Sequence, residues 1–181
     1  MPTESARGRP GPFDLHVHST CSVDGKSSVE EYARQAKALG LAEVGFCEHV
    51  DLDPRDMGYS YMDPGRYTRE ITAARAAVPD VRLLQGVEIT YQSGIEHTVL
   101  EWQEDHPWDY VVASVHMVDY ADGWAIISEP GAMGAYFAGH SQRQAYGPYF
   151  TELLRAVQSG LGDVLGHLDL VKRFGVRQYG P

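Results

Sequence analysis

The stretch Phe13-Asp14-Leu15-His16-Val17-His18 is the strongest indication of the fold of this chain of 181 residues. Its apolar residues alternate with Asp14, His16 and His18. This period of two predicts a short strand that points the three polar side chains to one face. Four later apolar runs also contain a histidine or a glutamate at their end, at residues 44–49, 83–88, 111–116 and 164–169. Parallel α/β barrels carry their chemistry at the C-terminal ends of their strands, so these runs predict polar ligands converging from five strand ends.

The segments between these runs have helical features. Ser27 or Ser28 caps a predicted helix that Gly40 ends, and Asp63-Pro64 opens a second one. Apolar spacing predicts further helices over residues 94–103 and 148–159. A strand followed by a helix, repeated about five times, predicts a parallel sheet with helices outside it. Residues 119–145 lack clear periodicity, and we expect them to form a long functional loop.

Composition limits the possible functions. The formal charge is −10, from 15 basic and 25 acidic side chains, which argues against binding to nucleic acid or an anionic membrane. Residues 1–12 resemble a flexible leader without an apolar signal segment, and residues 13–181 suffice for one domain. No apolar stretch approaches membrane-spanning length, so we expect a cytoplasmic protein. Cys21 and Cys47 have no zinc-finger spacing, and we expect two buried, reduced thiols.

The side chains at the strand ends predict a polynuclear metal site. His16 and His18 lie side by side on one strand, and imidazole suits Zn, Mn and Fe. Each of His49, His116 and His167 alone would be interpreted as a core or rim histidine. At equivalent ends of successive strands, they are better explained as ligands, with Glu88 as a bridging carboxylate. The candidate ligands are His16, His18, His49, Glu88, His116 and His167. Asp24 is either a further ligand or a residue that caps its loop.

Other polar residues have candidate roles beside this site. We expect Asp14, Glu48 and Asp169 to accept hydrogen bonds from the second ring nitrogen of the ligand histidines. Lys172, Arg173 and Ser114 are the candidates for binding a phosphate, although a solvated surface charge explains Lys172 equally well and Arg173 better. The sequence contains neither a Gly-x-Ser-x-Gly elbow nor a P-loop, which excludes those two chemistries.

Five motifs together resemble one known family. They are Asp-Leu-His-Val-His-Ser-Thr (14–20), Glu-His (48–49), Gly-Val-Glu (86–88), Ser-Val-His (114–116) and Gly-His-Leu-Asp-Leu-Val-Lys (166–172). The chain resembles the PHP (polymerase and histidinol phosphatase) superfamily, and most of all its histidinol-phosphatases. The resemblance implies a distorted (β/α)7 TIM-like barrel with two or three divalent ions, Zn, Mn, Fe or Co. It implies the metal ligands His16, His18, Asp24, His49, Glu88, His116 and His167.

The resemblance also implies the chemistry. A metal-bound hydroxide attacks phosphorus, with no protein nucleophile, and L-histidinol phosphate is hydrolysed in histidine biosynthesis. The family site is completed by an Asp-x-His pair on the last strand, and no such pair follows Asp169. We therefore expect a C-terminally truncated domain that ends after about five β/α units, with possible self-association through its open sheet edge. Two alternatives are another PHP phosphoesterase, acting on a nucleotide or other phosphate ester, and a truncated, inactive metal-binding fragment.

Overall fold

The structure is a computed structural model that describes residues 11–121 and 123–180. The expected leader thus lies almost entirely outside the described residues. The elements are, in order, β1 (Phe13–Val17), α1 (Val29–Leu39), β2 (Glu43–Val50), α2 (Pro64–Ala77), β3 (Arg82–Thr90), α3 (Glu96–Glu104), β4 (Tyr110–Ser114), β5 (Met117–Tyr120), β6 (Gly123–Ile126), α4 (Pro130–Ala138), α5 (Gln142–Ser159), β7 (Val164–Leu165) and α6 (Lys172–Tyr179). Among these helices, none has the length and apolarity needed to span a membrane.

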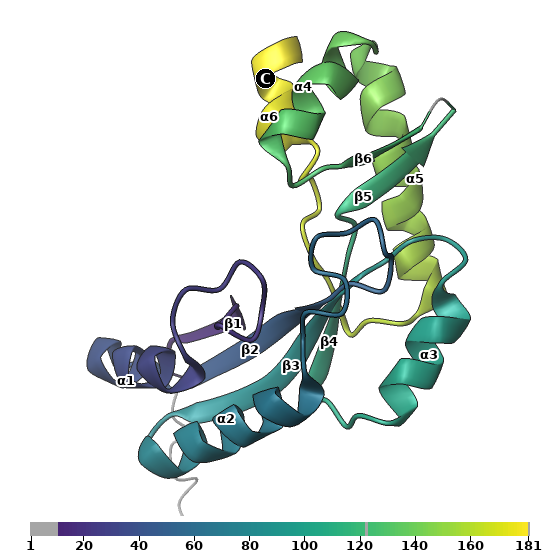
Figure 1. Cartoon of the computed structure of the whole chain (residues 1–181). Helices are drawn as coiled ribbons and strands as arrows, with labels where there is room; N and C mark the ends of the chain where they lie inside the picture. The colour runs from purple at the N-terminus through teal and green to yellow at the C-terminus, as the bar shows by residue number, and fades with distance from the viewer. Residues whose placement is uncertain (1–10, 122, 181) are drawn as a thin grey trace, which may run out of the picture.

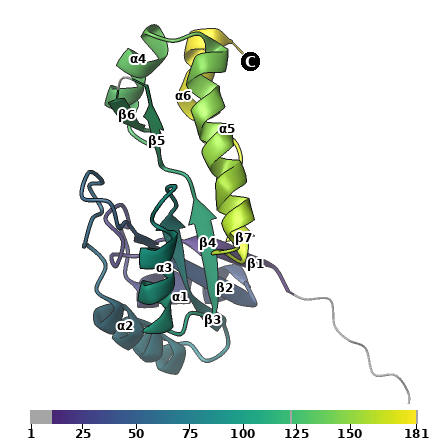
Figure 2. The same cartoon turned by 90° about the vertical axis from the view of Figure 1, so that its right-hand side faces the viewer.

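The main sheet has five strands in the order β1-β2-β3-β4-β7, and all neighbouring pairs are parallel. It curls like part of a barrel, with α1 and α2 along its outer side and α5 beside β4 and β7 (Figures 1 and 2). The predicted α/β class and the parallel sheet are confirmed. Parallel pairing brings the C-terminal ends of all five strands to one edge, which is where the candidate ligands lie.

Two helix starts follow local sequence rules. Ser28 accepts a hydrogen bond from the Glu31 amide, and the Glu31 side chain accepts one from the Ser28 amide, which forms a capping box at α1. Gly40 ends α1 in the left-handed conformation. Asp63 caps α2 by accepting from the Arg66 amide, and Pro64 occupies the first turn. These caps fix how each helix leaves its preceding loop.

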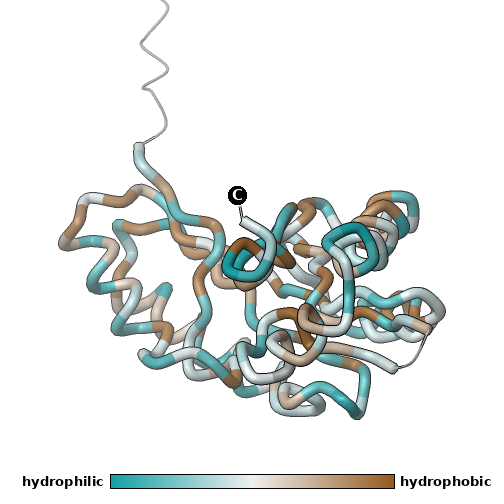
Figure 3. Tube along the Cα trace, turned by 90° about the horizontal axis from the view of Figure 1, so that it is seen from above, coloured by the Kyte–Doolittle hydropathy of each residue, from teal (hydrophilic) through white to brown (hydrophobic). Residues whose placement is uncertain are grey.

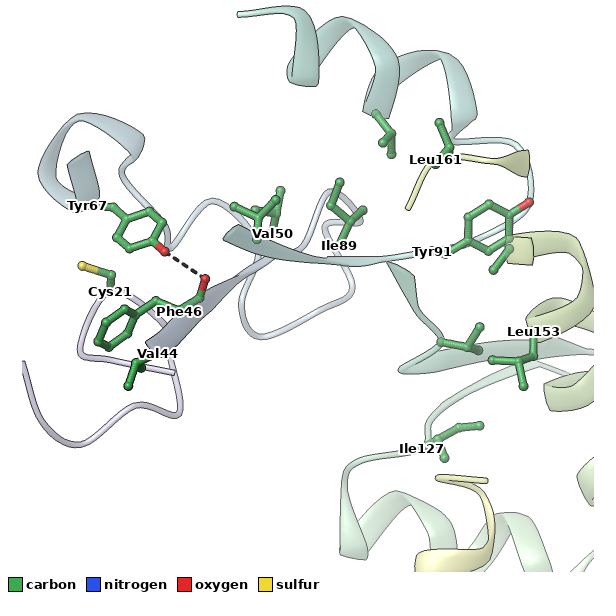
Figure 4. Close-up of a cluster of buried hydrophobic side chains, with 14 of the residues drawn as sticks. Cys21, Val44, Phe46, Val50, Tyr67, Ile89, Tyr91, Ile127, Leu153 and Leu161 are labelled. Atoms are coloured by element: carbon green, nitrogen blue, oxygen red, sulfur yellow. Dashed lines mark hydrogen bonds between the residues drawn. The ribbon is translucent and has the colours of Figure 1, made fainter. Parts of the chain in front are cut away.

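The core lies between the outer face of the sheet and the helices. Val44, Phe46 and Val50 of β2 and Ile89 of β3 are buried there (Figure 4). The Tyr67 hydroxyl, from α2, donates to the carbonyl of Phe46 at 3.2 Å and to that of Gly86 at 3.0 Å. Figure 3 colours the chain by hydropathy: hydrophilic residues recur along the helices, and hydrophobic residues are distributed along the whole chain. Because side chains alternate across a strand, filling the outer face with apolar residues leaves the inner face to polar ones.

The prediction of an irregular loop over residues 119–145 was wrong. This segment contributes to the antiparallel β5–β6 hairpin and forms all of α4. Helix α4 has poor intrinsic propensity, because Gly131 and Gly134 lie within it. It is stabilised by burial of Met133, Tyr136 and Phe137, which is a tertiary effect that local periodicity does not report.

The prediction for α5 placed its start too late. The helix begins at Gln142 rather than at Pro148, so the proline lies inside it. A second capping box, between Ser141 and Gln144, sets the true start. Together with α4, α6 and the hairpin, the upper end of α5 forms the part of the molecule above the sheet in Figure 1. Tyr179 of α6 joins this part by donating to the carbonyls of Phe137 and His140, at 3.0 and 2.7 Å.

Candidate metal centre

Glu88 lies at the centre of the candidate site. Its carboxylate is fully buried, and five histidines surround it. The distances from its oxygens are 3.4 Å to His16 Nε2, 3.3 Å to His18 Nε2, 3.6 Å to His49 Nδ1, 3.4 Å to His116 Nε2 and 3.0 Å to His167 Nε2. The structure thus brings five histidines from the ends of four strands, β1, β2, β4 and β7, together around the Glu88 carboxylate of β3.

Strand alternation explains most of this convergence. His16 and His18 share one face of β1 and its extension, and their ring centroids are 5.1 Å apart. His49, the penultimate residue of β2, lies on the same inner side and stacks on His18 at 4.4 Å between ring centroids. His116 follows β4 by two residues, so it keeps the facing of Ser114.

His167 reaches the site differently. It follows the short strand β7 and has a φ of 48°, in the left-handed region that non-glycine residues rarely adopt. Tyr149 of α5 donates a hydrogen bond to its carbonyl oxygen. Backbone strain of this kind persists where surrounding structure enforces it and occurs often at functional sites. Tertiary contacts therefore direct this imidazole toward Glu88.

Asp24 extends the cluster on one side. Its Oδ2 lies 3.7 Å from His49 Nε2, and the side chain is more than half exposed. The pKa of Asp24 is lowered to about 2, mainly by the contact with His49 and despite partial burial. Of the two roles weighed for this residue, its position favours ligation, because the ligating atoms of His18, Asp24 and His49 lie within 4.8 Å of one another.

The ionisation of the cluster follows from burial and from contacts with Glu88. Burial raises the pKa of Glu88, but the contacts with His116, His16 and His167 outweigh it and hold this pKa well below its usual range. Burial lowers the pKa of His18 to about 4. Burial also lowers the pKa of His49, but Asp24 and Glu88 outweigh it and raise the value to about 9. The cluster therefore combines a stable carboxylate with both neutral and protonated imidazoles.

The donor set fits divalent metal ions. Three further triads have ligating atoms within 4.8 Å of one another: His16 with Glu88 and His167, His49 with Glu88 and His116, and His16 with His18 and Cys47. Oε2 of Glu88 and Nδ1 of His49 are buried without a hydrogen-bond partner, which is costly unless something else binds them. Imidazole nitrogens with carboxylate oxygens suit zinc and neighbouring transition metals.

Three residues expected to orient the imidazoles have other partners. Asp14 accepts from the backbone N–H of His16 at 3.1 Å. Glu48 is buried and accepts from the hydroxyls of Ser19 and Ser22 at 2.5 and 2.6 Å, and burial raises its pKa. Asp169 pairs with Lys172 at 3.7 Å. Glu48 acts indirectly, because Ser22 also lies 3.4 Å from His18 Nδ1.

Two residues that the sequence analysis did not select orient His116. Thr90 Oγ1 lies 2.8 Å from His116 Nδ1 and donates to Asp51 Oδ1 at 2.5 Å. Because a hydroxyl has one proton, donation to Asp51 leaves Thr90 to accept from Nδ1–H of His116. Nε2 of His116 then carries the free lone pair that a ligand needs. The signal was present in the sequence, since Asp51 follows His49 by two residues and Thr90 follows Glu88 by two.

The three residues expected to bind phosphate are placed differently from one another. Ser114 is fully buried and donates to Glu88 Oε1, so its hydroxyl supports the carboxylate instead of facing a substrate. Gly166 makes this possible, because a Cβ there would collide with the Ser114 hydroxyl. Arg173 lines the cavity above the cluster, whereas Lys172 lies outside that lining, beside Asp169.

The cavity above the cluster has a volume of about 510 Å³. Imidazoles of His16, His18, His49, His116 and His167 line its floor, and its walls come from the loop after β2, from the turn between β6 and α4, and from the start of α6. Away from this lining, Cys21 and Cys47 are free and buried, as the sequence analysis expected. A pocket that joins several imidazoles, carboxylates and one arginine can hold metal ions and an anionic ligand together.

Comparison with known proteins identifies the family. The family model described as PHP domain matches residues 14–179. The chain belongs to this PHP family. The match begins at the second residue of β1, includes the metal-centre residues and reaches the last residue of α6, so the resemblance seen in the five motifs is confirmed.

Curated relatives of this PHP domain are histidinol-phosphatases by name. A probable histidinol-phosphatase of Deinococcus radiodurans is 32% identical over 179 residues, which cover 91% of this chain and 63% of the relative. The histidinol-phosphatase of Lactococcus lactis is 28% identical over 168 residues, which cover 90% of this chain and 58% of the relative. The chain thus spans about three fifths of the length of these relatives.

Solved structures show the same fold. A crystal structure of histidinol phosphate phosphatase from Lactococcus lactis, complexed with zinc, L-histidinol and phosphate, superposes with a TM-score of 0.79 at 27% identity. The superposition covers 94% of this PHP domain and 61% of that chain. A second structure, of a protein from Listeria monocytogenes, has a TM-score of 0.75 at 20% identity and supports the fold alone. The predicted PHP-type α/β architecture is therefore confirmed.

Proposed function

We propose that this PHP domain is a metal-dependent phosphomonoesterase that converts L-histidinol phosphate and water to L-histidinol and phosphate, in the histidine biosynthesis of the cytoplasm. The observation that carries the proposal is the buried Glu88 carboxylate within 3.0 to 3.6 Å of five imidazoles. The names of the relatives and the zinc, histidinol and phosphate in one of their structures support the choice of substrate.

The metal ligands in this proposal are His16, His18, Asp24, His49, Glu88, His116 and His167. Divalent ions supply Lewis acidity and lower the pKa of water that they bind, which makes a protein nucleophile unnecessary. Zinc is the first candidate because of the zinc-containing relative, and manganese, iron or cobalt are alternatives for the same donor set. Two or three ions match the overlapping triads around Glu88.

The chain's own residues have distinct tasks in this reaction. Thr90 keeps the proton of His116 on Nδ1, so that Nε2 is available as a ligand. Ser114 holds Glu88 in place by donating a hydrogen bond to its carboxylate. Ser22 contacts Nδ1 of His18, the ring nitrogen that faces away from Glu88. Arg173 lines the cavity beside His167, where a guanidinium attracts the phosphate dianion.

The proposal is tested by loading the 181-residue chain with zinc or manganese and measuring phosphate release. We expect release from L-histidinol phosphate, its loss in His116→Ala, and its loss after chelation. Hydrolysis of a nucleotide at a tenfold or greater rate would overturn the substrate and favour another phosphoesterase of the family. Bound metal without release from any ester would refute the proposed activity for this chain and favour the metal-binding alternative.

A further inference from the structure

The cavity wall carries two carboxylates that the metal centre does not use. Asp56, from the loop after β2, and Glu129, from the turn before α4, both line the cavity. Within residues 11–121 and 123–180, neither forms an ion pair. The neighbouring Arg55 is engaged elsewhere, with Asp53 at 2.6 Å and Asp119 at 2.8 Å. Two carboxylates therefore line the same cavity without an ion-pair partner among the described residues.

Asp56 is held in position by its own loop. Its Oδ1 accepts a hydrogen bond from the Gly58 amide at 2.8 Å. The loop folds back so that Asp51 and Tyr59 form an isolated bridge, and a Cβ at Gly58 would collide with Oδ2 of Asp51. The same Cβ would lie 3.4 Å from Oδ1 of Asp56, so the absence of a side chain at Gly58 leaves room for both carboxylates.

Glu129 is held in position from the metal centre itself. The amide of Ile127 donates to the carbonyl of His116 at 2.6 Å, which fixes the turn that leads into α4. Glu129 directly precedes this helix, yet its side chain makes no capping hydrogen bond. The carboxylate therefore lies at the N-terminal end of α4, where backbone N–H groups point outward, while it lines the cavity.

The floor and the walls of the cavity are lined by residues of different chemistry, so they suit different parts of a ligand. Oε2 of Glu88 is fully buried and has no hydrogen-bond partner, and it lies among the imidazoles that floor the cavity. Among the described residues, Arg173 is the only Lys or Arg in the lining. Apolar contacts are available on the walls from Val23, Met57, Ile126 and Leu170. The floor therefore suits metal and phosphate, while the walls suit a cationic group with an apolar part.

We propose that Asp56 and Glu129 bind the positive charge of the leaving alcohol and so select phosphate monoesters of cationic amino alcohols. This inference rests on the proposed function, because the phosphate end must lie at the metal centre. L-histidinol has an ammonium group and an imidazole ring, which match the carboxylates and the apolar wall. The same carboxylates repel esters with further negative charge, such as nucleotides, so they discriminate in both directions.

The test is binding of L-histidinol and of inorganic phosphate to the zinc-loaded chain, by calorimetry, in the wild type and in Glu129→Gln, Asp56→Asn and the double variant. Glu104→Gln, an exposed carboxylate at the end of α3, is the matched control. We expect L-histidinol to bind about tenfold more weakly in each single variant, with phosphate binding unchanged or tighter. The analogue of histidinol that lacks the amine should bind all variants alike.

The outcomes separate this inference from the proposed function. Unchanged L-histidinol affinity in the double variant would overturn the role of the carboxylates. Wild-type binding of phosphate without L-histidinol would overturn it as well, while leaving a phosphoesterase site. Failure of the zinc-loaded wild type to bind either molecule would refute both proposals. Zinc stoichiometry measured on every variant establishes that a lost affinity does not come from a damaged metal centre.

Discussion

Replacing Thr90 with valine should weaken the metal centre without touching a ligand. The Thr90 hydroxyl lies between Asp51 Oδ1, at 2.5 Å, and His116 Nδ1, at 2.8 Å, and all three side chains are buried. Valine keeps the shape of threonine but removes both hydrogen bonds. Asp51 and His116 then each have an unsatisfied polar atom, and His116 is no longer restricted to the tautomer with a free Nε2.

The magnitude follows from the geometry of this contact. Loss of a partner that orients a ligand histidine weakens metal binding by about 10- to 100-fold. This corresponds to about 1.4 to 2.7 kcal/mol. The unsatisfied buried groups should also lower the free energy of unfolding of the metal-free protein by about 1 to 3 kcal/mol. Both effects arise in one variant because the same hydroxyl supports the fold and the site.

The assay is zinc affinity by competition with a chromophoric chelator, together with urea unfolding of the metal-free protein. Thr72→Val is the matched control, because the Thr72 hydroxyl bonds only the exposed carbonyl of Thr68, at 2.8 Å, on α2. It should leave zinc affinity unchanged and stability within about 0.5 kcal/mol. Thr90→Ser should restore most of the zinc affinity. A Thr90→Val protein with wild-type zinc affinity would refute the reasoning about His116.

Three further predictions concern stability and metal binding. Ser28→Ala removes the capping box of α1 and should lower the free energy of unfolding by about 1 kcal/mol in urea titrations, and an unchanged midpoint would contradict the cap's contribution. The pKa of His49 is raised to about 9, so metal-free protein keeps this proton at neutral pH and zinc must displace it. Apparent zinc affinity should therefore rise with pH, and calorimetry in buffers of different ionisation enthalpy should detect proton release. Identical heats in all buffers would rule this out. Removing zinc with a chelator should lower the thermal midpoint, because an ion at 100 times its Kd stabilises the native state by about 2.7 kcal/mol. Equal midpoints with and without zinc would show that the native state does not bind it.

Much of the site was accessible from the sequence because strands impose a period of two. His16 and His18 share a face for this reason, and Glu88 and His116 lie on the inner side of neighbouring parallel strands. The same rule, applied further, would have found Asp51 and Thr90. It would also have rejected Glu48 as a direct partner of the imidazoles, because a residue next to His49 on a strand points to the opposite face.

The remaining features depend on contacts between distant residues. The left-handed backbone at His167 is enforced by α5 through Tyr149, and nothing near residue 167 reveals this. Helix α4 forms because Met133 and Phe137 are buried, although its glycines disfavour a helix. Ser114 is near a ligand in sequence, yet only the fold shows that its hydroxyl is taken by Glu88. Local patterns therefore predicted which residues gather, and tertiary packing decided what each one contacts.

The most direct test of the metal centre is a crystal structure of the zinc-loaded chain, with anomalous diffraction measured at the zinc absorption edge. We predict at least two zinc peaks, with Glu88 bonded to more than one of them and with His16, His18, His49, His116 and His167 among the ligands. A map with zinc bound elsewhere, or with no zinc within bonding distance of Glu88, would contradict the central claim.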